Sequence, residues 1–176
     1  PLCLIASRMS DFIPQLNRRF LMSHPAHFIA LGAGSGLSRL APGTAGTLWA
    51  WAVFALLQVW LTPFQMGMLI AASTLVGWWA CTVTARHMGV ADPGAIVWDE
   101  VIAFWLVLWL VTPTTFAGQL GAFVLFRYFD AAKPGPVRWA DSLFKGFGWR
   151  GGWGIIFDDL VAAFCTLLVF AIWRSL

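Results

Sequence analysis

The hydrophobic residues of this chain gather into long runs, and short stretches containing proline, glycine or charge separate the runs. A helix that crosses a bilayer core needs about 20 apolar residues. Residues 47–61 approach this length if residues 42–46 lead into them, and the runs at 64–85 and 155–173 have spanning length. Each of these three runs predicts a membrane-embedded helix.

Two shorter apolar runs lie at residues 101–111 and 116–126, and the turn-forming residues 112–115 separate them. These runs fit either two short spans or one re-entrant hairpin. Near the start, residues 12–20 place apolar side chains at near-helical spacing, with Arg18 and Arg19 on another face. That segment fits either an interfacial helix or a flexible leader.

The pattern as a whole predicts an all-α, polytopic membrane protein. We expect a compact multihelical bundle with about four to five membrane-embedded helices and an N-terminal interfacial helix. The length fits a single domain over residues 1–176, in which residues 1–23 form the leader or interfacial segment.

Composition supports a membrane location. Hydrophobic residues make up 60% of the chain and charged residues 11%, whereas soluble domains carry about twice that share of charge. Twelve Trp and fifteen Phe provide bulk for lipid contact and interfacial anchoring. The net charge of +3 is better explained by membrane topology than by nucleic-acid binding, so we expect no nucleic-acid partner.

The basic residues indicate which side of the membrane each loop occupies. If the runs are successive crossings, ten of the eleven Lys and Arg residues fall on one side, and Arg174 is the exception. The alternate turns, near residues 62–63 and 112–115, contain no Lys or Arg. The positive-inside rule therefore places the charged loops in the cytoplasm.

Acidic residues adjoin the apolar runs on the same side. Seven of the eight follow position 90, and two adjacent pairs, Asp99–Glu100 and Asp158–Asp159, stand at the start of apolar runs. A carboxylate at the bilayer centre costs about 2.5–3.5 kcal/mol, so these groups need cations, metal or water. A single acid would fit helix capping, but two pairs fit it poorly.

The same acids suggest a metal site. Adjacent helical positions point about 100° apart, so we expect one member of each pair to bind a metal and the other to bridge or hold a partner. Arg127, Asp130 and Lys133, spaced i, i+3 and i+6, project to one side of a helix. Oxygen ligands without a plausible His or Cys set favour Mg²⁺. We expect the three scattered histidines to lie at the interface or surface.

Two glycine-rich stretches allow more than one interpretation. Residues 146–151 match GxGxxG, but no strand precedes them, so a Rossmann site is rejected. They form either a flexible loop or a turn that offers backbone N–H groups to a phosphate beside Asp158. Residues 32–46 form either a close-packing segment or an anion cradle that uses Ser35, Ser38 and Thr44.

Four segments together resemble the phosphatidylglycerophosphatase A family, Mg²⁺-dependent enzymes that convert phosphatidylglycerophosphate to phosphatidylglycerol in bacterial inner membranes. They are GSGLSRLAPGTAGT at 34–47, DPGAIVWDE at 92–100, FRYFDAAKPGPVRW at 126–139 and GGWGIIFDD at 151–159. The chain departs from the family pattern at Ala103 and Ala163, where glycine is typical, and at residues 147–150, which lengthen the last loop.

The resemblance implies a phosphoric monoester hydrolase that acts on phosphatidylglycerophosphate among membrane lipids. It also implies a multi-pass protein of the inner membrane, with the active site facing the cytoplasm. The implied catalytic residues are Asp99, Glu100, Asp130, Asp158 and Asp159. The implied Mg²⁺ ligands among them are Glu100, Asp130, Asp158 and Asp159. The resemblance also implies that Arg127 and Lys133 bind phosphate and that Asp92 supports the ligands. To these we add Arg138 and Ser35 as candidate phosphate-binding residues and Thr44 as a supporting residue, although anchoring to anionic lipid headgroups explains Arg138 better.

Two other classes of membrane protein could share this pattern of apolar runs. A small transporter or channel subunit would use acids near the membrane centre for protons or cations and would show an inverted repeat. A scaffold for lipid-synthesis enzymes would not need the carboxylate clusters. Acids gathered at one face beside cations favour the phosphatase.

Overall fold

The computed structural model describes residues 16–175, and this part of the chain is helical with no strand. The helices are α2 (Arg18–Met22), α3 (Pro25–Ala30), the 3₁₀ helix η1 (Gly32–Leu37), α4 (Pro42–Leu57), α5 (Pro63–Met88), α6 (Trp98–Val111), α7 (Phe116–Ala132), α8 (Pro136–Leu143) and α9 (Trp149–Ser175). The predicted all-α class is confirmed.

Two of the described helices are long and apolar enough to cross a membrane: α5 with 26 residues and α9 with 27. At 1.5 Å per residue each is about 40 Å long. Helices α4, α6 and α7 have 16, 14 and 17 residues, so each is shorter than a full span. The predicted count of four to five embedded helices therefore includes three that do not reach across a bilayer by length alone.

Of the predicted N-terminal helix at residues 12–20, the structure describes residues 16–20, and α2 accounts for the part from Arg18 onward. Helix α2 starts at Arg18, because the side chain of Asn17 accepts a hydrogen bond from the backbone N–H of Phe20 and caps the first turn. Residues 12–15 of the predicted segment lie outside the described residues. Arg18, Arg19 and Met22 are exposed on α2, and the interfacial location stays a prediction.

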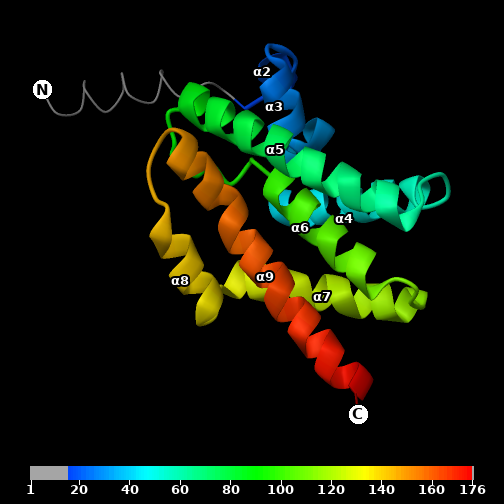
Figure 1. Ribbon diagram of the computed structural model, residues 1–176. Helices are drawn as coiled ribbons and strands as arrows, with labels where there is room; N and C mark the ends of the chain where they lie inside the picture. The colour runs from blue at the N-terminus through cyan, green and yellow to red at the C-terminus, as the bar shows by residue number, and fades with distance from the viewer. Residues whose placement is uncertain (1–15, 176) are drawn as a thin grey trace, which may run out of the picture.

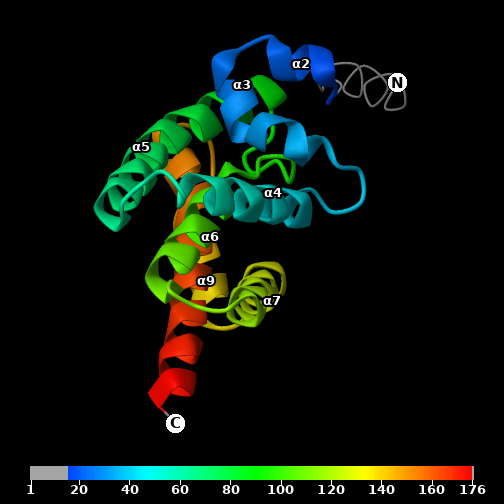
Figure 2. The same ribbon diagram turned by 90° about the vertical axis from the view of Figure 1, so that its right-hand side faces the viewer.

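Helix α6 occupies the centre of the bundle, between α5, α4, α7 and α9 (Figures 1 and 2). Ten of its 14 residues are buried, including Asp99 and Glu100 in its first turn. A helix that is hydrophobic on all sides is stable when other helices surround it. The central position of α6 therefore carries two carboxylates into the protein interior.

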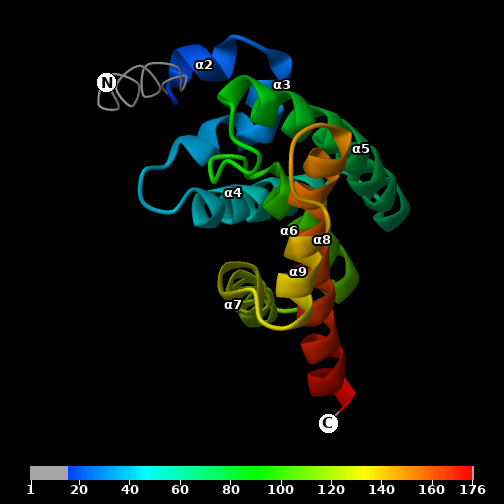
Figure 3. The same cartoon turned by 90° about the vertical axis from the view of Figure 1, so that its left-hand side faces the viewer.

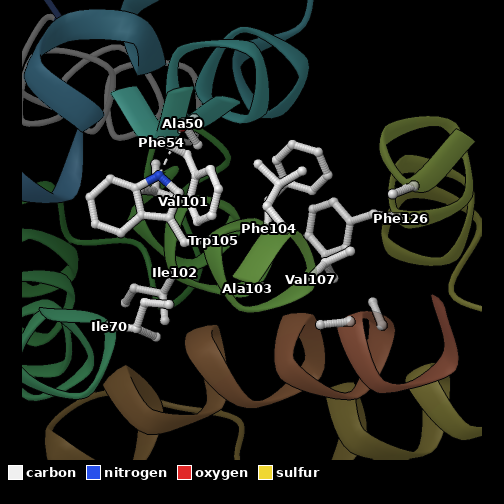
Figure 4. Packing of buried hydrophobic residues seen from close by; sticks show 14 of the residues in the cluster. Ala50, Phe54, Ile70, Val101, Ile102, Ala103, Phe104, Trp105, Val107 and Phe126 are labelled. Atoms are coloured by element: carbon white, nitrogen blue, oxygen red, sulfur yellow. Dashed lines mark hydrogen bonds between the residues drawn. The ribbon is translucent and has the colours of Figure 1, made fainter. Parts of the chain in front are cut away.

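Aromatic side chains fill the space around α6 and also connect helices. Phe104 stacks on Phe126 of α7, with ring centroids 5.6 Å apart, and the indole of Trp105 donates to the carbonyl oxygen of Ala50 on α4 at 2.8 Å (Figure 4). Four more indole N–H groups bond to other segments: Trp51 to Gln119, Trp78 to Trp149, Trp98 to Ser73 and Trp109 to Pro63. Because an unpaired N–H is costly in apolar surroundings, these bonds fix how the helices pack.

Small residues let α9 and α6 approach α5 closely. A methyl group on Gly152 of α9 would lie 1.9 Å from the hydroxyl oxygen of Thr82, and one on Gly77 of α5 would lie 2.4 Å from the Trp98 ring. Neither gap can hold a side chain without movement. This packing brings the first half of α9 beside the start of α6.

Arg174, the one basic residue outside the predicted charge pattern, has a local role at the other end of the molecule. Its guanidinium donates to the carbonyl oxygens of Val111 at 3.3 Å and Pro113 at 3.0 Å. Val111 is the last residue of α6 and Pro113 lies in the turn that follows, so these carbonyls lack helical partners. The C-terminal end of α9 is thus attached to the turn between α6 and α7.

The lipid-facing character of the protein is visible in its exposed apolar side chains. Large ones lie along α5, α7 and the second half of α9; examples are Phe64, Met68, Leu75, Phe116, Leu120, Val124, Phe164, Leu168 and Ile172. A soluble monomer rarely exposes so extensive an apolar surface. Helix α8 differs: it packs against the first half of α9 (Figure 3), burying Val137 and exposing Arg138 and Trp139.

Candidate active site

Three carboxylates meet inside the bundle. Asp99 and Glu100 of α6 and Asp159 of α9 each offer an oxygen, and the three oxygens lie within 4.8 Å of one another. All three residues are buried. Within residues 16–175 no other three Asp, Glu, His or Cys residues bring ligand atoms this close together. We call Asp99, Glu100 and Asp159 the acid cluster.

Both members of the Asp99–Glu100 pair belong to the acid cluster, so the expectation that adjacent positions would diverge is wrong for this pair. The separation of about 100° applies to the Cα–Cβ bonds, and longer side chains can still converge beyond them. The second pair does diverge. Asp159 joins the acid cluster, whereas Asp158 contacts Lys133.

The acid cluster can hold a hard divalent cation. One oxygen of each member, Asp99 Oδ1, Glu100 Oε2 and Asp159 Oδ2, is buried and has no hydrogen-bond partner. Buried oxygens in this condition are costly, and three neighbouring carboxylates repel one another. A divalent cation compensates both effects, and a donor set made only of oxygen suits such an ion.

Helix α7 contributes an ion pair at the edge of the acid cluster. Arg127 forms a salt bridge with Asp130, one turn later, and its Nη1 lies 3.7 Å from Glu100 Oε1. Asp130 is close enough to Glu100 and Asp159 for its charge to act on both. A partly exposed guanidinium therefore stands beside the carboxylates of Asp130 and Glu100, at the edge of the acid cluster.

Lys133 connects the helices α7, α8 and α9. It ends α7 in the left-handed conformation, with φ 43° and ψ 56°, and its ammonium contacts Asp158 of α9 and, at 2.9 Å, Asp141 of α8. Burial alone would lower the pKa of Lys133, but the hydrogen bonds and charges of Asp158 and Asp141 raise it above its usual range.

Asp141 is a site residue that the sequence analysis did not identify. It binds Lys145 at 2.7 Å as well as Lys133. Burial would raise its pKa, but the two lysines outweigh burial and hold the pKa of Asp141 below its usual range. Its i, i+4 spacing with Lys145 was the only signal in the sequence, and such pairs are common on helix surfaces.

Replacing Asp141 with asparagine is expected to lower thermal stability near neutral pH. Because folding lowers the pKa of Asp141, its contribution is present above the unfolded-state pKa of about 3.9 and is lost as pH falls through the folded-state value. The difference in melting temperature between wild type and Asp141→Asn should therefore shrink below about pH 4. An equal difference at pH 7 and pH 3.5 would contradict this assignment.

The other residues predicted to bind phosphate or to support the site differ in their surroundings. Asp92 lines a cavity of about 60 Å³ together with Asp141, Lys145 and Asp158. The hydroxyl of Ser35 donates to the carbonyl of Gly32 within η1. Arg138 is exposed on α8 and forms no ion pair with any residue in 16–175.

The start of α4 lies directly against the acid cluster. A Cβ on Gly43 would be 2.3 Å from Glu100 Oε1 and 3.0 Å from Arg127 Nη1. Thr44 follows Gly43 in the first turn of the same helix. The glycine-rich stretch at residues 32–46 thus includes a close-packing position at the site.

The histidines, which are scattered in the sequence, gather on α3 and α5. His27 Nε2 lies 2.8 Å from His87 Nδ1, and His24 Nδ1 accepts a hydrogen bond from the Ala26 backbone N–H. Burial lowers the pKa of His27. This group of histidines is not part of the acid cluster. Helix α3 is nevertheless connected to α6, because the carbonyl oxygen of Ala30 at the end of α3 accepts a hydrogen bond from the backbone N–H of Val97 at 2.9 Å. Helix α3 therefore supports the start of α6.

The family model of phosphatidylglycerophosphatase A matches residues 28–174 of the chain. The chain belongs to the phosphatidylglycerophosphatase A family. The matched range contains the acid cluster, Arg127, Asp130 and the contacts of Lys133. The resemblance inferred from four segments of the sequence is therefore confirmed.

Curated relatives agree with this membership. The phosphatidylglycerophosphatase A of Escherichia coli (strain K12) is 39% identical over 145 residues, covering 82% of this chain and 80% of its own. The phosphatidylglycerophosphatase A of Haemophilus influenzae is 36% identical over 157 residues, covering 88% and 93%. A putative phosphatidylinositol-3-phosphatase of Bacteroides thetaiotaomicron is 34% identical over 152 residues, covering 83% and 91%. No solved structure matches the chain.

Proposed function

We propose that this member of the phosphatidylglycerophosphatase A family hydrolyses the terminal phosphomonoester of phosphatidylglycerophosphate, giving phosphatidylglycerol and inorganic phosphate. The observation that carries this proposal is the acid cluster, with three unpartnered buried oxygens beside the Arg127 guanidinium. Oxygen ligands for a cation next to a fork of N–H donors are suited to phosphate esters. The names of the E. coli and H. influenzae relatives support the choice of substrate.

In this proposal Asp99, Glu100 and Asp159 hold Mg²⁺, and Asp130 supports the site from α7. When bound, Mg²⁺ supplies positive charge for the phosphoryl oxygens and makes a water molecule more acidic. The ligand set differs from the sequence hypothesis in three members. Asp130 becomes a supporting residue because it forms a salt bridge with Arg127. Asp99 is added because one of its carboxylate oxygens lies in the acid cluster. Asp158 becomes a supporting residue because its carboxylate forms a salt bridge with the ammonium of Lys133.

The protein's own side chains bind and orient the phosphate. Arg127 can donate two parallel hydrogen bonds to phosphoryl oxygens, and its salt bridge with Asp130 fixes its direction. Lys133 fixes Asp158 and, through Asp141, the position of α8. In the proposal a carboxylate oxygen that does not bind the cation accepts the proton of the attacking water.

The apolar exterior suits a lipid substrate. Phe116, Leu120 and Val124 are exposed along α7, the helix that carries Arg127 near its end. The acyl chains of the substrate can remain in the bilayer while the phosphate enters at the polar end of the protein, where the start of α6 and the end of α7 carry the acidic residues and Arg127. The positive-inside rule places that end in the cytoplasm, and we propose the bacterial inner membrane as the location.

A transporter or channel is not supported. That alternative requires acids that move protons or cations near the membrane centre. Here Asp130 and Asp158 are paired with Arg127 and Lys133, and the family is one of phosphatases.

The test is phosphate release from phosphatidylglycerophosphate by the full chain in detergent, with Mg²⁺ or with EDTA. We expect release with Mg²⁺ and almost none with EDTA. Phosphatidic acid and phosphatidylinositol-3-phosphate in parallel assays measure the preference among lipid phosphates. No release with any divalent ion would refute the proposed activity, and equal release with EDTA would refute the metal assignment.

A further inference from the structure

Helices α2 and α3 form an open groove with a volume of about 470 Å³, which we call the α2–α3 groove. No member of the acid cluster lines it. Its lining is apolar apart from one imidazole and consists of Leu21, Met22, His24, Pro25, Phe28 and Ile29. Met22 and Phe28 are exposed to 72% and 45%. An apolar groove left open in this way is typical of a surface that receives an apolar partner.

The other side of α3 attaches the groove to the spanning helix α5. Ala26 and Ala30 are fully buried and belong to one apolar cluster with Ala80 of α5. Figure 2 shows α2 and α3 at the end of the molecule opposite to the C-terminal end of α9. The ring centroids of His24 and Trp79, a partly exposed residue of α5, are 6.0 Å apart. Because Trp is enriched where membrane and water meet, the α2–α3 groove continues the lipid-facing surface of α5 at the membrane interface.

Two arginines of α2 add positive charge beside the groove. Arg18 precedes Leu21 and Met22 by three and four positions, which places these side chains on the same face of α2. Arg18 and Arg19 are exposed, and neither forms an ion pair with any residue in 16–175. The sequence contains no Asp or Glu from position 12 to position 91. The groove therefore combines apolar walls with two positive charges that no described carboxylate pairs with.

We propose that the α2–α3 groove binds one anionic phospholipid of the surrounding membrane. The acyl chain lies along Met22, Phe28 and Ile29, and the phosphate of the headgroup faces Arg18 and Arg19. Burial of the acyl chain stabilises any phospholipid in the groove, and the arginines add attraction for a headgroup with net negative charge. The inference goes beyond the proposed phosphatase activity and does not depend on it, because the groove shares no residue with the acid cluster.

The test measures lipid binding by native mass spectrometry on the full chain in detergent, which counts individual bound lipids. The probes are phosphatidylserine and phosphatidylcholine with the same acyl chains. Neither carries a phosphomonoester, so neither is a substrate of the proposed reaction, and they differ in net charge. We expect the first phosphatidylserine to bind at least about tenfold more tightly than phosphatidylcholine, since each basic residue near the headgroup contributes about fivefold.

Variants of the arginines separate the groove from general attraction of anionic lipid. Arg18→Gln and Arg19→Gln should each weaken the binding of phosphatidylserine about fivefold and leave the binding of phosphatidylcholine unchanged. Arg39→Gln is the matched control, because Arg39 is also exposed but follows η1, outside the groove. This variant should bind both lipids as wild type does.

The apolar wall is tested by Met22→Gln, which should weaken the binding of both lipids about tenfold because the acyl chain loses an apolar contact. Met68→Gln is its control, since Met68 is an exposed methionine of α5 outside the groove. It should change the binding of neither lipid. Both positions are exposed, so the two variants should melt at the temperature of wild type.

Equal affinity of wild type for the two lipids would overturn the inference, as would equal losses in Arg18→Gln and Arg39→Gln or in Met22→Gln and Met68→Gln. A two-chain species that Met22→Gln abolishes would assign the groove to a second copy of the chain and would also overturn it. Phosphate release is judged separately. Cleavage of phosphatidylglycerophosphate without selective binding of phosphatidylserine contradicts only this inference, and selective binding without cleavage of any lipid phosphate contradicts only the proposed function.

Discussion

Replacing Asp159 with asparagine is expected to lower the rate of phosphate release by at least about 100-fold, since even the loss of groups that only support a metal ligand costs 10- to 100-fold. Asp159 is buried on α9 and supplies one of the three converging oxygens of the acid cluster. Asparagine has nearly the same shape, so the packing of α9 against α6 should persist. The measurement is the initial rate at saturating Mg²⁺.

A second readout separates loss of metal binding from loss of structure. Without a cation, the three acids of the cluster repel one another, and asparagine removes one of the charges. The metal-free variant should therefore melt at or above the temperature of metal-free wild type, whereas the stabilisation by Mg²⁺ should be lost. Asp141→Asn is the control, because it makes the same chemical change outside the acid cluster. If Asp159→Asn is still stabilised by Mg²⁺ as wild type is, the ligand assignment is wrong.

Replacing Arg127 with glutamine is expected to reduce the rate about 10²- to 10³-fold, the usual cost of losing a donor aimed at charge that develops in the transition state. Arg127 is the cation nearest to the acid cluster, 3.7 Å from Glu100 Oε1. Arg127→Lys should recover only part of the rate, since an ammonium keeps the charge but cannot form two parallel hydrogen bonds.

The control for Arg127 is Arg138→Gln on the exposed face of α8. This variant also removes one positive charge from the polar end of the protein, so it tests general attraction of an anionic lipid. We expect it to retain most of the activity. Equal losses of activity in Arg127→Gln and Arg138→Gln would show that both residues act only by general electrostatic attraction of the anionic lipid, and that Arg127 makes no specific contact with the phosphate.

Much of the fold follows from the length of the apolar runs. The runs at 64–85 and 155–173 lie within α5 and α9, the two helices long enough to span. Hydropathy did not reveal where α9 begins. Asp158 and Asp159 were expected at the start of the last helix, but α9 already begins at Trp149. Its first turns contain glycines that pack closely against α5 and against the loop before α9, and an apolar pattern does not reveal such contacts.

The site was predictable in its residue types more than in its contacts. Carboxylates beside apolar runs are costly and therefore conspicuous, which is why Asp99, Glu100 and Asp159 could be named from the sequence. The contacts of Gly43 with Glu100 and of Lys133 with Asp158 join segments far apart along the chain. Spacing along one helix says nothing about such pairs, and a glycine gives no chemical hint of what lies against it.

The position of Asp159 on the final helix also bears on how the protein is made. Asp99 and Glu100 enter the bundle on α6, while the third oxygen of the acid cluster belongs to α9. During synthesis the chain therefore carries two acids on its central helix before their common partner helix exists. In the proposed function, the cation site is therefore complete only after the last helix has docked, and a chain that lacks α9 would lack one of its three ligands.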